Sequence, residues 1–142
     1  MRKLAERLVA HETRKGKSLE TKTPANFIAI EKLRPQLTTL MGNAGFGALL
    51  MRARALACTE VSWLRELQIK ADGSLDGFDG IKARVKAKEL FTGKVVLLTQ
   101  LLGLLHAFIG EILTLRLVIE VWPGLSLDDM DFGGGDNNEK QK

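Results

Sequence analysis

The segment DGSLDG, residues 72–77, groups the side chains best suited to hold a metal ion. Oxygen-bearing side chains stand at its first, third and fifth positions (Asp72, Ser74 and Asp76), and Gly77 follows at the sixth. This order is the first half of a calcium-binding loop, whose twelfth position should carry a bidentate glutamate. That position is Ala83 here. Because aspartate and glycine are also the commonest turn formers, the segment predicts a turn rather than a cation site.

A histidine and a glutamate within the long apolar segment 95–122 are the next candidates. His106 and Glu111 are five residues apart, so on a helix they lie at opposite margins of one face. With His11 and Cys58 as the only other histidine and cysteine, the chain has too few ligands for a convincing zinc site. We expect His106 to be a hydrogen-bonded core residue or to face a partner, and Glu111 to be buried and paired with a basic side chain. Cys58 is expected to be an inert core thiol.

The sequence contains no motif for nucleophilic catalysis or for phosphate binding. Its serines lie in predicted turns or caps, with too few histidines to activate them. The glycine-rich segment GNAGFG at 42–47 lacks the lysine and hydroxyl residue of a phosphate-binding loop. It also follows a helical pattern, where a dinucleotide fingerprint requires a strand. We therefore predict no catalytic residue, no cofactor and no metal ligand, and a non-enzymatic protein.

The element that must position these side chains is the segment 95–122, which is aliphatic on nearly every side. A helix that is apolar almost all round is either the centre of a domain or a membrane span. One arc of small and polar residues interrupts it. We expect this arc to meet another backbone at short range, through the candidate interaction residues Gly103, His106, Ala107, Gly110, Glu111 and Thr114.

A single membrane span at residues 95–121 is the main alternative. The segment would reach roughly 40 Å as a helix, enough to cross a bilayer. Basic residues precede it and an acidic tail follows, as expected for an inside-basic orientation. Gln100, His106 and Glu111 would, however, lie at membrane depth, where polar groups are costly. The pattern therefore favours a helix wrapped by protein.

Composition and charge place the chain among single-domain globular proteins. The 142 residues are 45% hydrophobic and 27% charged, and the absence of tyrosine with abundant leucine and alanine favours helix over sheet. One cysteine indicates a reducing compartment, and the charged N-terminus does not suit a signal peptide, so we expect a cytoplasmic protein. The net charge of +4 divides into basic stretches at 1–22 and 81–94 and an acidic stretch at 124–139.

The N-terminal half of the chain predicts several helices separated by breaks. Residues 2–14 suit a helix, 14–22 a loop or linker, and Thr23-Pro24 a helix start. Pro35 should end that helix near Lys32 or kink it there, and Gly42-Asn43 should break the pattern again. In the next helix, Gly45 and Gly47 suggest close approach of a neighbouring backbone. Arg52 and Arg54 fall outside its apolar stripe and should be solvated.

Residues 67–77 are the one place where strand is plausible, as a short hairpin around Asp72-Gly73 or an ordered loop. Residues 81–88 are ambiguous between an extended segment and the lead-in to a helix, and Pro123-Gly124 should end the central helix. Three parts follow: a basic N-terminal helix and linker at 1–22, a helical core at 23–124, and an acidic tail at 125–142, expected to be disordered.

The sequence thus predicts an all-α fold, a compact bundle of four to five helices around one long central apolar helix, with a β-hairpin at 67–77. Its predicted role is a protein-interaction or regulatory module that self-associates as a homo-oligomer, because the central segment is more apolar than thin amphipathic helices readily cover. The alternatives are the membrane-associated component with its one span and a non-specific anion or nucleic-acid binder using the basic N-terminal arm. The basic segments have no interleaved aromatics, which disfavours nucleic acid.

Overall fold

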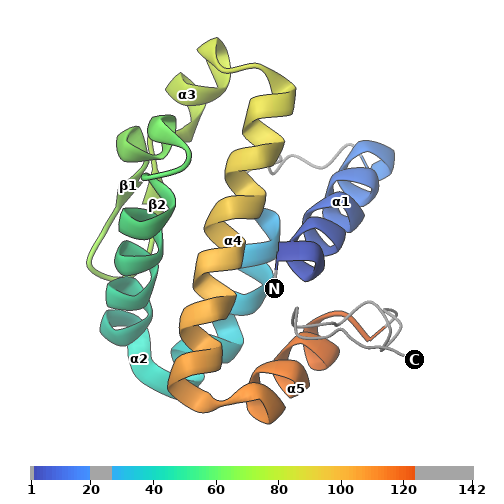
Figure 1. Ribbon diagram of the computed structural model, residues 1–142, viewed down its shortest axis with the longest axis vertical. Helices are drawn as coiled ribbons and strands as arrows, with labels where there is room; N and C mark the ends of the chain where they lie inside the picture. The colour runs from blue at the N-terminus through green and yellow to red at the C-terminus, as the bar shows by residue number, and fades with distance from the viewer. Residues whose placement is uncertain (1, 20–26, 124–142) are drawn as a thin grey trace.

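The computed structural model describes residues 2–19 and 27–123, and within them the chain is an all-α bundle with one small hairpin (Figure 1). This confirms the predicted fold class. The elements in chain order are α1 (Arg2–Leu19), α2 (Ile28–Ala57), the 3-10 helix η1 (Ser62–Glu66), β1 (Gln68–Ile69), β2 (Leu75–Asp76), α3 (Phe78–Arg84), α4 (Ala87–Ile109) and α5 (Glu111–Val121).

Helix α4 is the central element, and α1, α2 and α5 all pack against it. Its middle turns are buried at Val95, Val96, Leu97, Leu98, Leu101, Leu102 and Leu105. Within the described residues, α4 is also the one helix long and apolar enough to cross a membrane by length and composition. The same apolar surface is what a helix packed against three others requires in a protein core.

The predicted continuous helix over 95–122 is wrong at one point, Gly110. This residue has φ 91° and ψ 165°, a conformation that is essentially restricted to glycine, and it ends α4 and precedes α5. Helix α5 therefore turns back beside the bundle instead of extending α4 (Figure 1). The Thr114 hydroxyl donates to the Gly110 carbonyl oxygen at 2.8 Å. This side-chain hydrogen bond lies across the first turn of α5.

Helix α2 has the same kind of corner at Gly42, with φ 80° and ψ 165°. The predicted break at Gly42-Asn43 is confirmed, and the helix is two segments, 28–41 and 43–57, that run down and then up the molecule (Figure 1). The predicted end near Lys32 is wrong, because the helix continues through Pro35, and the alternative of a kink there stays a prediction. Leu33 and Leu37 are fully buried on either side of Pro35, and this packing offsets the lost backbone hydrogen bond.

At the N-terminus, the helix is longer than predicted. Residues 14–19, expected to be loop, belong to α1, consistent with their many lysines and arginines, which are good helix formers. The predicted helix start at Thr23-Pro24 and the predicted disordered tail both lie outside the described residues. Farther along, residues 81–84 end α3, Val85 and Lys86 are extended, and α4 begins at Ala87, so each alternative holds for part of residues 81–88.

The hairpin is confirmed and lies directly on α2. The Gly73 amide donates to the Lys70 carbonyl and the Lys70 amide to the Ser74 carbonyl, at 2.8 and 2.9 Å, with Gly73 at φ 89°. This is a three-residue loop closed by a left-handed glycine. A Cβ at Gly47 would lie 2.3 Å from the Ala71 carbonyl oxygen, so the close backbone approach predicted there is confirmed.

Candidate interaction surface

The predicted small-residue arc lies mostly on the outside of the molecule. Ala107, Gly110 and Glu111 are exposed, His106 and Gly103 are half-buried, and Thr114 alone is fully buried. A Cβ at Gly103 or Gly110 would meet no described atom within 4 Å. No other described helix of this chain therefore uses these glycines for close approach, and contact with another molecule stays a prediction.

The predicted burial and pairing of Glu111 are wrong. Glu111 is exposed in the first turn of α5, and no described residue forms an ion pair with it. The Gly110 corner is the reason: it rotates α5 away from the face that a straight helix would have presented to the core. An acid in a first helical turn is instead stabilised by the partial positive charge of the helix N-terminus.

The arginine predictions differ within α2. Arg52 is exposed as expected, but Arg54 is half-buried and donates from Nη1 to the Leu67 carbonyl oxygen at 2.5 Å. It thereby fastens α2 to the start of the hairpin. Cys58 is half-buried at the C-terminal end of α2 rather than in the core.

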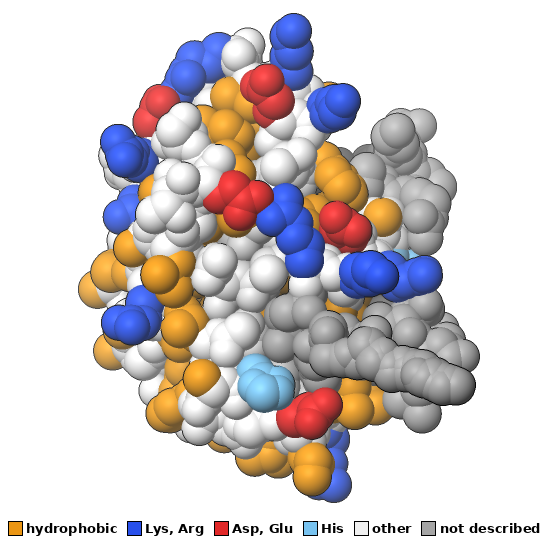
Figure 2. Space-filling model, in the orientation of Figure 1, with side chains coloured by type: hydrophobic (Ala, Val, Ile, Leu, Met, Phe, Trp, Pro, Cys, Tyr) orange, Lys and Arg blue, Asp and Glu red, His pale blue; other side chains and the backbone are white. Residues whose placement is uncertain are grey.

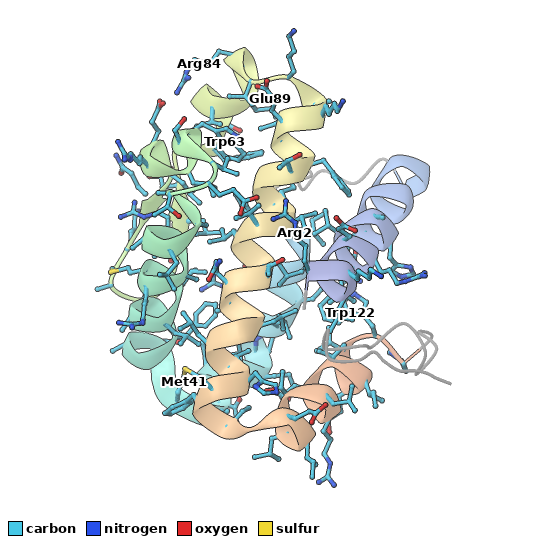
Figure 3. All side chains as sticks on the ribbon, in the orientation of Figure 1. Arg2, Met41, Trp63, Arg84, Glu89 and Trp122 are labelled. Carbon is cyan, nitrogen blue, oxygen red and sulfur yellow. The ribbon has the colours of Figure 1, made fainter. Side chains whose placement is uncertain are left out.

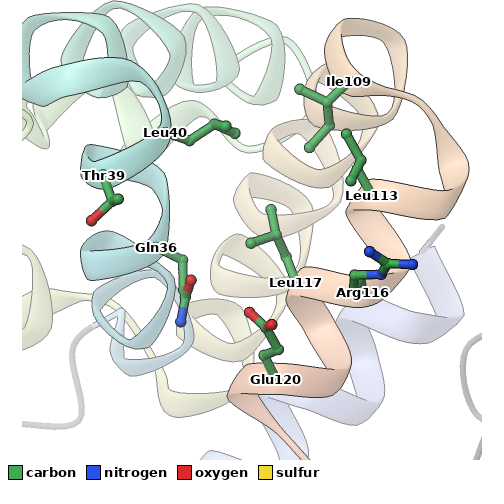
Figure 4. Close-up of a pocket in the computed structure, with 8 residues that line it drawn as sticks. All are labelled: Gln36, Thr39, Leu40, Ile109, Leu113, Arg116, Leu117 and Glu120. Carbon is green, nitrogen blue, oxygen red and sulfur yellow. The ribbon is translucent and has the colours of Figure 1, made fainter.

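An apolar groove runs between the first segment of α2 and the corner formed by α4 and α5 (Figure 4). It has a volume of about 370 Å³. Leu40, Ile109, Leu113 and Leu117 supply its apolar wall. The polar residues that complete its lining are Gln36, Thr39, Arg116 and Glu120.

Large apolar side chains at the groove, and next in the sequence to its lining residues, are open to solvent. Phe108 is 67% exposed and Ile112 73%, one on each side of Gly110, while Leu40 and Leu113 are 50% and 46% exposed. Figure 2 shows hydrophobic side chains gathered at the lower end of the molecule, where α4 turns into α5, and along the second segment of α2. We call the groove with Phe108 and Ile112 the corner surface. Contiguous exposed apolar area of this kind marks an interaction site in many proteins.

Two opposite charges lie within the corner surface. Arg116 and Glu120 are exposed and stand one helical turn apart on α5. Neither forms an ion pair or hydrogen bond with another described residue, and Figure 4 shows their charged groups apart. The order arginine then glutamate is the less favourable one for pairing within a helix. Both charges are therefore available to a molecule that covers the groove.

A buried polar network ties the two ends of the chain together. Glu12 of α1 is 5% exposed, and its Oε2 accepts hydrogen bonds from Lys32 Nζ at 2.5 Å and Trp122 Nε1 at 2.8 Å. Trp122 follows α5 and lies between α5 and α1 (Figure 3). This network was not predicted from the sequence. One sequence signal was available: Glu12 follows Leu4 by eight residues, a spacing that places both on the same, buried side of α1.

At the other end of the molecule, Lys94 lies in an apolar setting. Its Nζ is 5.6 Å from the centroid of the Phe78 ring, and the neighbouring Gly93 packs against the Trp63 indole, where a Cβ would be 2.1 Å from Cζ2. Burial, with a smaller contribution from Lys82, lowers the pKa of Lys94 to about 8. Burial of the Lys94 ammonium costs solvation free energy, and the cation–π contact with the Phe78 ring offsets that cost only in part.

The half calcium loop forms turn contacts. Asp72 Oδ1 accepts from the Ser74 amide at 2.9 Å and Asp76 Oδ1 from the Gly77 amide at 2.8 Å. Hydrogen bonds from Ser74, with a smaller effect of Arg34, lower the pKa of Asp72. Arg34 itself donates to the Gly73 carbonyl at 2.9 Å and binds Glu31 through two nitrogens. Among the described residues, no three His, Cys, Asp or Glu side chains are grouped to hold a metal ion.

With the geometry in view, comparison with known proteins adds no relative. No protein-family model, no curated protein and no solved structure matches this chain significantly.

Proposed function

We propose that this chain is a non-enzymatic helical module that associates with other protein molecules, in the first place with copies of itself, through the corner surface. The observation that carries the proposal is the exposure of Phe108 and Ile112 beside an apolar groove. Covering side chains of this size removes apolar area from water and is favourable by about 1.5–3 kcal/mol for each one fully buried. The buried core beneath, around α4, keeps the surface in place.

The shape of the site favours a helix as the bound element. The groove lies between α2 on one side and α4 and α5 on the other, and its apolar residues on α5, Leu113 and Leu117, are four apart. An amphipathic helix laid in such a groove buries residues at three- and four-residue spacing. Gln36 and Thr39 would form the polar rim on the α2 side that fixes its position.

The test compares the mass of the purified protein with that of a surface variant over a wide concentration range, by sedimentation velocity and light scattering. We expect the wild type to gain mass with concentration and Phe108→Ser/Ile112→Ser to remain monomeric with unchanged circular dichroism. The matched control is Leu56→Ser, since Leu56 is 40% exposed at the far end of α2 from the corner. A wild type that stays monomeric throughout would contradict the proposal.

A second candidate function, membrane association, rests on α4. This 23-residue helix is long and apolar enough to cross a bilayer, although its window is already partly buried against the other helices. The Gly110 corner limits the spanning segment to α4 itself, in place of the predicted 95–121. Fractionation of cells that make the protein separates the two candidates. Recovery only with detergent would support the membrane candidate and contradict the first.

A further inference from the structure

We infer that the occupant of the groove is α5 of a second copy, in a two-fold antiparallel pair that brings Arg116 of each copy to Glu120 of the other. This inference rests on the proposed function and specifies its partner. Its basis is the pattern on the free face of α5.

The free face of α5 combines apolar residues with the unpaired charges. Thr114, Val118 and Trp122 point into the bundle, and each side chain is at most 3% exposed. At 100° per residue, the opposite side of the helix carries a continuous arc. That arc consists of Ile119, Ile112, Arg116, Glu120, Leu113 and Leu117. The two charges therefore lie in the middle of an apolar stripe, not at its edge.

A two-fold axis makes such a stripe complementary to itself. In an antiparallel pair whose two-fold axis is level with Val118, a residue a given number of positions before Val118 in one copy lies opposite the residue the same number of positions after Val118 in the other. Arg116 then lies level with Glu120 of the partner copy, while Leu117 and Ile119 lie along opposite edges of the stripe. The pairing forms two equal ion pairs, flanked by Leu117 along one edge of the stripe and Ile119 along the other, and is self-complementary as a closed dimer interface requires. A single charge sign on the stripe would instead repel its own copy.

The same charges argue against a lipid surface as the occupant. Around the corner surface the charged residues are Glu111, Arg116 and Glu120, two acids and one base. Attraction to an anionic leaflet requires clustered lysine or arginine. The basic residues Lys82, Lys86 and Lys88 are exposed near the start of α4, at the opposite end of that helix.

The test is charge exchange. Arg116→Glu alone places acid opposite acid and Glu120→Arg alone places base opposite base, so each is expected to self-associate about tenfold more weakly than the wild type. An equal mixture of the two variants has two matched pairs, Glu against Arg, and should associate as the wild type does. The double variant Arg116→Glu/Glu120→Arg should also self-associate. Arg52→Glu, a reversal at an exposed site on α2, is the matched control and should change nothing.

The outcomes separate this inference from the proposed function. A wild type that remains monomeric overturns both, and binding of that monomer to phosphatidylcholine–phosphatidylserine vesicles would assign the surface to lipid. A wild type that associates while both single reversals associate equally well overturns the α5 pairing alone. Loss in the single variants without recovery in their mixture also overturns it, because the charges would then contact other groups.

Discussion

Removing the cation from the buried Glu12 network tests how the two ends of the chain hold together. In Lys32→Met, the Glu12 carboxylate stays 5% exposed with only the Trp122 indole as a described partner. Unpairing a fully buried ion pair costs about 3–5 kcal/mol. Because the Lys32 side chain is 33% exposed, solvent already weakens the pair, and we expect a loss of about 2–3 kcal/mol in the free energy of unfolding.

Two further variants separate charge from packing at the same site. Glu12→Gln keeps an oxygen for the Trp122 N–H and lets Lys32 turn to solvent, so it should cost about 1 kcal/mol. Glu12→Met/Lys32→Met removes both charges and fills similar volume, and should come within about 1 kcal/mol of the wild type. If Lys32→Met leaves an unpaired buried charge, the double variant should be more stable than Lys32→Met.

The assay is urea unfolding followed by far-ultraviolet circular dichroism, with a shift of the midpoint at unchanged slope. In a thermal scan the Lys32→Met loss corresponds to a fall in Tm of about 6–10 °C for a chain of this size. The predicted unpaired charge is refuted if the stability of Lys32→Met lies within about 0.5 kcal/mol of the wild type, the range of ordinary surface changes. It is equally refuted if the double variant is less stable than Lys32→Met.

Two other predictions concern α4. Gly93→Ala places a Cβ 2.1 Å from the Trp63 ring and should lower the free energy of unfolding by about 1–3 kcal/mol. In Gly103→Ala the new Cβ would have no described atom within 4 Å, so the free energy of unfolding should rise by up to about 1 kcal/mol. Chemical denaturation of both variants tests the pair, and effects of the same sign would contradict the prediction. The pKa of Lys94 is lowered to about 8 in the folded state, so the unfolded chain binds more protons above that pH. Stability should therefore rise between about pH 8 and 10.5, by about 1–2 kcal/mol after allowance for solvent screening, and Lys94→Met should abolish that rise in denaturation curves across this range. An identical pH dependence in Lys94→Met would contradict the assignment.

The parts of the fold that the sequence predicts are those marked by local chemistry. The apolar run from Val95 identifies the central helix, and Asp72-Gly73 and Gly42-Asn43 are turn signals that need no tertiary information. The close backbone approach at Gly47 could be predicted because a glycine inside a helical pattern usually has a packing reason. The hairpin that packs against it is that reason.

The parts that could not be predicted depend on which surfaces meet. Gly110 lies within an apolar run and has no proline or polar cluster beside it. From the sequence alone, such a glycine indicates close helix packing rather than a break between two helices. Pro35 is tolerated because buried leucines flank it, a tertiary effect that overrides local preference. For the site, the sequence identified the neighbourhood of Gly110 but not the groove, because Leu40 reaches it from another helix.

The bond between Glu12 and Trp122 joins residues 110 positions apart, so it has a consequence for the order in which the protein forms during translation. The first helix leaves the ribosome long before its indole donor exists. Until Trp122 is made, that acid must stay hydrated or pair with Lys32 alone, so α1 gains this part of its docking energy only after α5 has been synthesised. A chain stalled after α4 but before Trp122 would therefore leave Glu12 without its indole donor and the α4 surface that α5 covers open to chaperones and proteases.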